Sequence, residues 1–266
     1  MAEDGGAPKP MPFRGGGFQP SPRRWAAVAA LVVIVAVWQV SVQNRWVSPI
    51  FLPSPGAILR ALYALLESGA LAGHVAASLQ RIGLGFVLGA SAGVVVGIAI
   101  GLVSLARAVG MPIVSALFPI PKIAVLPLFI LWFGIGEPSK VATIALGVFF
   151  PTVISTAAGV DGVARNLIRM AQSFNVPTSA IVLKIVLPGA LPGILAGCRI
   201  SASIALILVV AAEMIGAERG IGAFILTAGN LMQTDQLLAG VAMLSVLGLI
   251  VGTGLTRLER WLLAWR

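Results

Sequence analysis

Long apolar runs recur along this chain, and they constrain its fold more than any other feature of the sequence. A helix needs about 20 mostly apolar residues to cross the hydrocarbon core of a bilayer. The chain is 58% hydrophobic and only 10% charged, whereas soluble domains are about half apolar and a quarter charged. Runs of this length favour helices over the short alternating strands of a membrane barrel. We therefore predict an all-α integral membrane protein.

Six segments have the length and composition of a membrane-spanning helix. They cover about residues 25–42, 79–102, 111–135, 141–160, 191–212 and 237–255. The first exceeds the apolar core of most signal peptides, so we interpret it as a retained helix, with cleavage after it as the alternative. Residues 1–22 are rich in Gly and Pro and have no apolar period, which predicts a disordered cytoplasmic tail ahead of a membrane domain at 23–266.

Two stretches predict how the helices are arranged. Residues 44–73 carry Leu and Ile at helical spacing, which predicts an amphipathic helix on the outer surface. The second span has glycines four residues apart, forming one ridge that allows another helix to approach closely. They are Gly85, Gly89, Gly93, Gly97 and Gly101.

The basic residues indicate the orientation in the membrane. With both termini inside, the cytoplasmic set is Lys9, Arg14, Arg23, Arg24, Arg107, Arg165, Arg169, Lys184, Arg257, Arg260 and Arg266. The outer set is Arg45, Arg60, Lys140 and Arg219. Cytoplasmic loops carry an excess of Lys and Arg, so this topology is favoured. The positive residues form no single patch, which argues against nucleic acid as a partner.

The sequence contains no catalytic constellation, and we do not expect an enzyme. It has one cysteine, Cys198, and one histidine, His74, which leaves no cluster for a metal ion. It also lacks a G-x-x-x-x-G-K-[ST] phosphate loop, so any ATP must be hydrolysed by another chain. His74, Ser78 and Arg81 share one helical face, and we interpret them as interfacial anchors.

Charged residues within the spans are the candidates for a solute pathway. An ionisable residue at mid-depth is costly and usually faces a cavity or a partner. Lys122 lies among Pro119, Pro121 and Pro127, whose freed backbone groups also need partners or a water-filled cavity. Arg199 could face an anion pathway or snorkel to the headgroups. Glu213 could pair with another charge or line the outer gate.

A polar interruption at residues 169–188 separates two apolar runs and predicts a helix, a break and a second helix. Asn175 tolerates a left-handed backbone better than most residues. Pro177 disfavours helical geometry at Val176 and suits the first turn of the next helix. Taken alone, the stretch is also compatible with a simple polar loop between two membrane helices.

The spacing within this stretch resembles the EAA motif, E-A-A-x3-G-x9-I-x-L-P, of permease subunits of ABC importers. Ala171, Ile185 and Leu187-Pro188 match, whereas Arg169, Met170 and Asn175 replace Glu, Ala and Gly. Two further stretches, 119–136 and 213–225, are similar to the sulfonate, taurine and nitrate branch of these permeases. The resemblance covers about residues 45–266.

The resemblance implies a type I ABC importer permease fold with six transmembrane helices and an EAA-type cytoplasmic coupling helix. It implies a homodimer with a second permease copy, two ATPase subunits that bind ATP and Mg²⁺, and an extracytoplasmic substrate-binding protein. The chain would bind no cofactor itself and would lie among lipids of a bacterial inner membrane. The implied ATPase-coupling residues are Arg169, Met170, Ala171, Phe174, Asn175, Pro177, Ile185, Leu187 and Pro188.

The implied solute is small and anionic, such as a sulfonate, taurine, nitrate or bicarbonate, although small aromatic or heterocyclic compounds also fit this branch. The main alternative is a secondary transporter driven by an ion gradient, which would require an inverted repeat and acidic residues at mid-membrane. Neither feature is evident in the sequence. A structural anchor without transport would give no role to the proline-broken third span.

Overall fold

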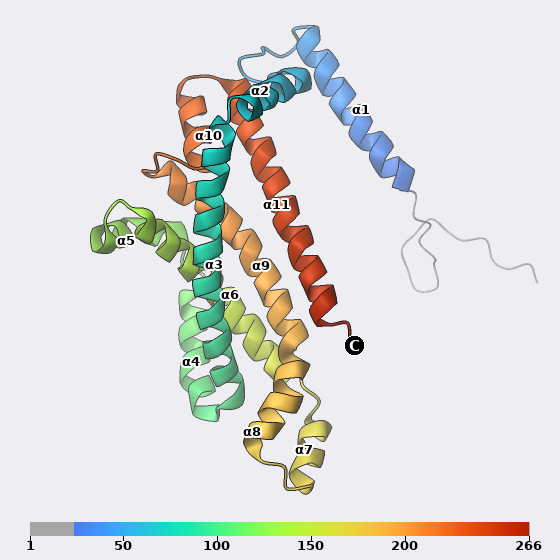
Figure 1. The fold of residues 1–266 in the computed structure, drawn as a ribbon, viewed down its shortest axis with the longest axis vertical. Helices are drawn as coiled ribbons and strands as arrows, with labels where there is room; N and C mark the ends of the chain where they lie inside the picture. Colours follow the sequence, from blue (N-terminus) through green and yellow to red (C-terminus); the bar gives the residue numbers. More distant parts are fainter. Residues whose placement is uncertain (1–23, 266) are drawn as a thin grey trace, which may run out of the picture. The chain divides into compact units, whose positions relative to one another are not determined.

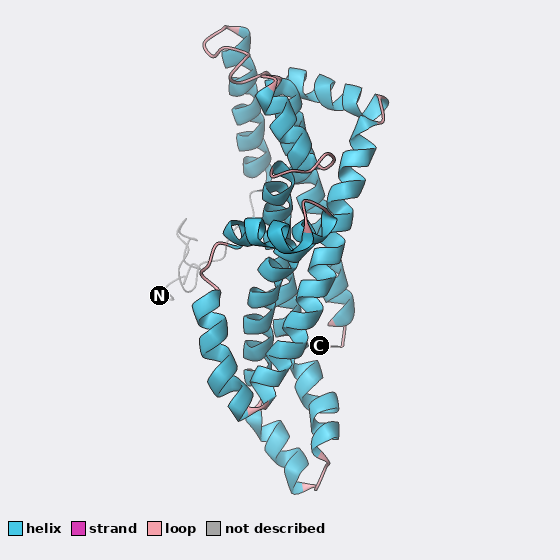
Figure 2. Ribbon diagram, turned by 90° about the vertical axis from the view of Figure 1, so that its left-hand side faces the viewer, coloured by secondary structure: helices cyan, strands magenta, loops and turns pink. Residues whose placement is uncertain are grey.

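A computed structural model describes residues 24–265, and every regular element in that range is a helix (Figure 2). The tail predicted at residues 1–22, together with Arg23 and Arg266, lies outside the described residues. The chain divides into two compact units, Met1–Gly56 and Ala57–Arg266.

The described part of the first unit is built on α1 (Arg24–Gln43). Its apolar part, Val28–Gln43, is shorter than the four long membrane-crossing helices of the second unit. The helix ends at Gln43. Just beyond it, Arg45 has a φ of 58°, and the Trp46 N–H donates to the Ser41 carbonyl at 3.0 Å. A left-handed residue of this kind commonly terminates a helix.

The second unit contains the remaining helices and the whole of the bundle. In chain order they are α2 (Pro55–Glu67, which begins two residues before the boundary), α3 (Ala70–Leu102), α4 (Ser104–Leu117), η1 (Lys122–Val125), α5 (Leu126–Phe133), α6 (Glu137–Asp161), α7 (Arg165–Ser173), α8 (Thr178–Ile181), η2 (Val182–Val186), α9 (Leu187–Met214), α10 (Ile221–Asn230) and α11 (Thr234–Leu262). The amphipathic helix expected at residues 44–73 is therefore shorter and corresponds to α2.

Four helices among the described residues are long and apolar enough to cross a membrane. They are Ala70–Leu102, Glu137–Asp161, Thr178–Met214 and Thr234–Leu262. The predicted third span begins earlier than expected, at Ser104, and consists of two helices bent by 90°, Ser104–Leu117 and Lys122–Phe133. Counting this pair as one span gives five, compared with the six spans expected.

The bend between α4 and α5 follows from the prolines at 119 and 121, which supply no backbone N–H. Lys122 compensates for the lost donors, because its ammonium donates to the carbonyls of Leu117, Phe118 and Ile120 at 2.7–2.9 Å. Beyond the bend, α5 projects sideways from the bundle (Figure 1). The third predicted span therefore turns away from the direction of its first half.

The predicted glycine ridge of α3 is confirmed, and it packs against α6. A Cβ atom on Gly89 would lie 2.3 Å from the Ala145 carbonyl oxygen, and one on Gly97 would lie 2.6 Å from Cβ of Thr156. Only a residue without a side chain permits this approach of two helix backbones. The two helices run side by side in Figure 1.

The other face of α6 packs against α9 by the same means. A Cβ on Gly193 would lie 2.6 Å from the Cα of Gly159, so these two helices also approach closely. The hydroxyls of Thr152 and Ser201 lie 2.8 Å apart within this contact, and both are buried. The core of the bundle is therefore a three-helix arrangement with α6 at its centre, sandwiched between α3 and α9.

Candidate functional site

The sequence singled out residues 169–188, here called the coupling segment, and the structure forms them into a helix, a turn and a second helix. The turn covers residues 174–177 and is called the Asn175 turn. Asn175 has a φ of 55°, which confirms the predicted left-handed backbone. The N–H groups of Asn175 and Val176 donate to the carbonyls of Gln172 and Ala171 at 2.9 and 3.1 Å. These bonds satisfy the last carbonyls of α7 and fix the turn.

One face of the coupling segment is buried and the other is exposed. Ala171 and Ile181 belong to an apolar cluster with Val163 and Val186. By contrast, the side chain of Phe174 is 76% exposed, and Met170 is also largely exposed. A large aromatic side chain held in this position by a fixed turn can act as a contact for another protein.

The second helix of the segment contains a widened turn before Pro188. Residues Val182–Val186 form a π-helix, and the Leu187 N–H donates to the Val182 carbonyl, five residues back. Pro188 has no N–H to offer to the Lys184 carbonyl, so an ordinary helical ladder is interrupted here. Ile185 packs against the apolar cluster below Ala171. The Ile-x-Leu-Pro pattern therefore ends the segment at a distinct backbone feature.

A second candidate region lies where α3 meets the start of α6 and the end of α9. At its centre is Arg81, which is only 3% exposed. The Arg81 guanidinium donates through Nε and Nη2 to both carboxylate oxygens of Glu137 at 2.6 Å, and through Nη1 to Glu213 at 2.7 Å. Nη1 also donates to the Arg219 carbonyl at 2.6 Å. We call Ser78, Arg81, Glu137 and Glu213 the Arg81 cluster.

Glu213 connects the Arg81 cluster to the loop before α10. Its carboxylate accepts from the Ser78 hydroxyl at 2.7 Å and from the Gly222 N–H at 2.8 Å, and it is almost completely buried. Gly220 has a φ of 140°, and a Cβ there would lie 2.3 Å from Cδ of Glu213. These donors offset the loss of water that burial of a carboxylate entails.

The interpretation of His74, Ser78 and Arg81 as interfacial anchors was wrong. Ser78 and Arg81 are buried and bind Glu213, while the His74 Nδ1 accepts from the Gly220 N–H at 3.1 Å. The sequence did carry a signal, because opposite charges stand near the ends of two apolar spans. The role of Glu137 went unrecognised because it lies at the first residue of α6, 56 positions from Arg81 in sequence.

The candidate pathway residues Lys122, Arg199 and Glu213 do not form one site in this structure. The Lys122 ammonium lies 4.5 Å from the centre of the Phe150 ring, in addition to its three carbonyl contacts. Arg199 pairs with Glu259 of α11, and Glu213 belongs to the Arg81 cluster. Each of the three charges therefore has a partner on a different part of the bundle.

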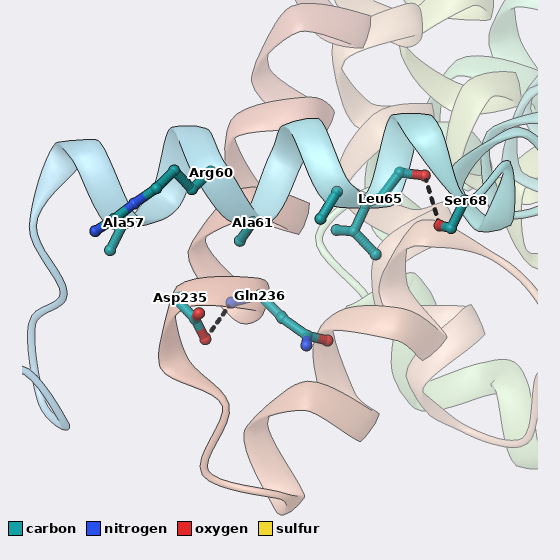
Figure 3. Close-up of a pocket in the computed structure, with 8 residues that line it drawn as sticks. Ala57, Arg60, Ala61, Leu65, Ser68, Asp235 and Gln236 are labelled. Atoms are coloured by element: carbon teal, nitrogen blue, oxygen red, sulfur yellow. Dashed lines mark hydrogen bonds between the residues drawn. The ribbon is translucent and has the colours of Figure 1, made fainter.

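Two cavities lie in the half of the bundle that contains the Arg81 cluster. The first, of about 490 Å³, lies between α2 and the start of α11 and is lined by Arg60, Leu65 and Asp235 (Figure 3). The second, of about 470 Å³, is lined by Arg81, Lys140 and the loop at residues 216–219. Among residues 24–265, no three His, Cys, Asp or Glu side chains gather as they would around a metal ion.

The fold and these regions define the class of protein. Long apolar helices, a central contact made by glycines and a charged cluster buried between spans characterise a polytopic helical membrane protein.

Comparisons with known proteins identify the family. Residues 89–264 match the family described as binding-protein-dependent transport system inner membrane component. The chain is 38% identical to the taurine transport system permease protein TauC of Escherichia coli, covering 90% of this chain and 89% of that protein. It is 39% identical to the putative aliphatic sulfonates transport permease protein SsuC of Bacillus subtilis, covering 93% and 91%.

A solved structure supports the fold. The chain matches a subunit of the inward facing MetNI methionine ABC transporter with a TM-score of 0.56 and 22% identity, over 79% of this chain and 98% of that subunit. The chain belongs to the family of binding-protein-dependent transport system inner membrane components. It is a membrane-embedded permease of the ABC transporter class, with the type I importer fold.

Proposed function

We propose that this chain is the transmembrane subunit of an ATP-driven importer for a small anionic solute of the sulfonate or taurine type. The observation that carries the proposal is the identity of 38–39%, over about nine-tenths of the chain, to permeases named for taurine and aliphatic sulfonates. Nitrate and bicarbonate are further members of the proposed solute class. A separate extracytoplasmic protein would bind the solute and deliver it.

The proposed complex contains two copies of this chain and two ATPase subunits. ATP and Mg²⁺ would bind the ATPase, and this chain would contribute no catalytic group. The excess of basic residues at one end supports an orientation with both termini in the cytoplasm of a bacterial inner membrane. That orientation puts the Asn175 turn on the cytoplasmic side, within reach of an ATPase.

The coupling segment is the proposed contact with the ATPase. Phe174 and Met170 offer exposed apolar surface, and Arg169 adds an exposed charge beside them. Ala171 and Ile185 face the apolar cluster, which would transmit a push on the turn to α6 and α9. Asn175 and Pro177 would keep the Asn175 turn compact, and Leu187-Pro188 would mark the point where the coupling segment joins its membrane helix.

We retain Lys122, Arg199 and Glu213 as proposed pathway residues. Because each already has a partner in this conformation, a passing solute would have to compete with that partner. Such competition fits a pathway that opens only in part of a transport cycle. The Glu213 carboxylate accepts from three groups, which makes it a poor candidate for the proton carrier that an ion-driven transporter would need.

Copurification from native membranes tests the proposal. The tagged chain, extracted in mild detergent, should retain an ATPase in a one-to-one ratio by native mass. Phe174→Asp should lose the ATPase because a charge would replace the exposed aromatic contact. Phe51→Asp is the matched control, since Phe51 is also highly exposed but lies far from the coupling segment in sequence. A chain that purifies alone and moves a sulfonate in ATP-free vesicles would instead support the secondary transporter.

A further inference from the structure

The cavity of about 470 Å³ beside the Arg81 cluster contains a buried cation with unused hydrogen-bonding capacity. Lys140, in the first turn of α6, lines this cavity, and its residue is only 3% exposed. Its ammonium donates to the Gly136 carbonyl at 3.1 Å, and this is its one hydrogen bond to the described residues. An ammonium has three donors. Two of them are therefore available.

The neighbouring cation, Arg81, has its hydrogen-bond donors occupied by other groups of the chain. Its guanidinium is occupied by two carboxylates and a backbone carbonyl, and it forms ion pairs with Glu137 and Glu213. Lys140 forms no ion pair with any residue of the described chain. Glu137 and Glu213 attract Lys140 only from beyond ion-pair distance. A buried charge without a direct partner is costly, and such a group is usually completed by a ligand or a counter-charge. The incomplete member of this region is thus Lys140.

We propose that this cavity is an oxyanion site, in which the Lys140 ammonium binds the sulfonate group of the transported solute. The inference rests on the proposed function and deepens it by assigning a contact for the anionic group. A cavity of this size is in the range of small-molecule sites. The cavity is also lined by Glu137, which is paired with Arg81, and by the loop at residues 216–219, which includes Glu218. Arg81 holds this loop through the Arg219 carbonyl.

The arrangement gives the Arg81 cluster a supporting role. Glu137 and Glu213 take up the charge of Arg81, so that Arg81 positions α3, α6 and the loop without competing for the solute. Lys140 is the group that would contact the solute. In the proposed orientation the cavity opens near the outer side, where a binding protein would release its cargo.

The test measures binding of ethanesulfonate to the purified permease with its ATPase in lipid nanodiscs, by saturation-transfer NMR and without binding protein. The wild-type complex should bind ethanesulfonate, and should not bind dimethyl sulfone, which lacks the charge. Lys140→Gln should weaken ethanesulfonate binding about tenfold or more, because a charge-assisted hydrogen bond is lost. Lys140→Arg should restore most of it, and Arg257→Gln, at an exposed arginine of α11 outside both the cavity and the coupling segment, should have no effect.

Two results would overturn the assignment. One is equal binding of ethanesulfonate by Lys140→Gln and wild type. The other is competition by inorganic sulfate as strong as that by ethanesulfonate, which would identify a site for free oxyanions instead of the solute. If Lys140→Gln does not fold, the wild-type comparison of ethanesulfonate with dimethyl sulfone still decides, since equal weak binding of both refutes a charge-dependent site. If Lys140→Gln still imports the sulfonate in an ATP-dependent manner like wild type, the Lys140 site is refuted but the proposed function is retained.

Discussion

The Arg81 cluster and the Asn175 turn lie at opposite ends of the same helices and are held by opposite means. Ser78, Arg81 and Glu213 of the Arg81 cluster are buried, Glu137 lies at its exposed edge, and the charges bind one another across three helices. The Asn175 turn is fixed by its own backbone and by the small buried side chain of Ala171, while its large apolar residues remain exposed. The ion pairs of the first region lie within one chain, whereas the second leaves large apolar side chains exposed.

The two regions should therefore respond differently when a residue is removed. Removing a member of the Arg81 cluster leaves a buried charge without its partner, which is costly for the fold. Removing an exposed residue of the turn leaves the chain folded and alters only what it can contact. Mutations in the two regions should therefore have opposite effects on stability and assembly.

The largest loss of stability is expected for Glu213→Ala. Arg81 and Ser78 would lose their buried acceptor, and we expect the free energy of unfolding to fall by about 3–5 kcal/mol. Denaturant titration of the detergent-solubilised chain measures this change. Glu67→Ala, at an exposed residue of α2, is the control and should be nearly neutral. Equal stability of the two variants would mean that the Arg81 cluster does not hold the helices together.

A smaller loss is expected for Gly89→Ala at the α3–α6 contact. The added methyl group would meet the Ala145 carbonyl oxygen at 2.3 Å, so the helices must separate. Overpacking of this kind costs about 1–3 kcal/mol. Gly252→Ala is the matched control, because a Cβ there would meet open space. The same titration should show destabilisation for position 89 alone, and a neutral Gly89→Ala would contradict the packing described.

Several features of this fold could be predicted from the sequence. The glycines of α3 predicted a close helix contact because their four-residue spacing places them on one face. Asn175 could be predicted because few residues other than glycine accept its φ. In both cases the determining information is local, within a turn or two of one helix.

The features that could not be predicted depend on residues far apart in the chain. Arg81 binds Glu137 and Glu213, and nothing in the residues around Arg81 specifies either partner. The 90° bend at Pro119 and Pro121 was also unpredicted, since prolines indicate a break without its direction. That Lys140 forms no ion pair within the described residues emerged only when the contacts of its neighbours were known.

At the Asn175 turn, a substitution should change transport more than stability. Asn175→Val places a β-branched residue at a φ of 55°, a local strain of about 1–3 kcal/mol. We expect a shift of the turn and severalfold slower ATP-dependent uptake in proteoliposomes. Asn175→Gly, which accepts this φ without strain, should retain wild-type uptake. Wild-type uptake by an Asn175→Val variant that assembles normally would argue against a role for this turn in coupling.

The smallest effect is expected at Arg107, which forms a two-pronged ion pair with Asp161 near the coupling segment. Both side chains are substantially exposed, so water and salt compete with the pair and its contribution to stability should be slight. Arg107→Gln should therefore leave the unfolding midpoint unchanged, whereas Arg81→Gln should lower it strongly. If Arg107→Gln instead lowers the unfolding midpoint strongly, and high salt abolishes the difference, exposed ion pairs also stabilise this bundle. In that case burial would not explain the different stabilities of the two regions.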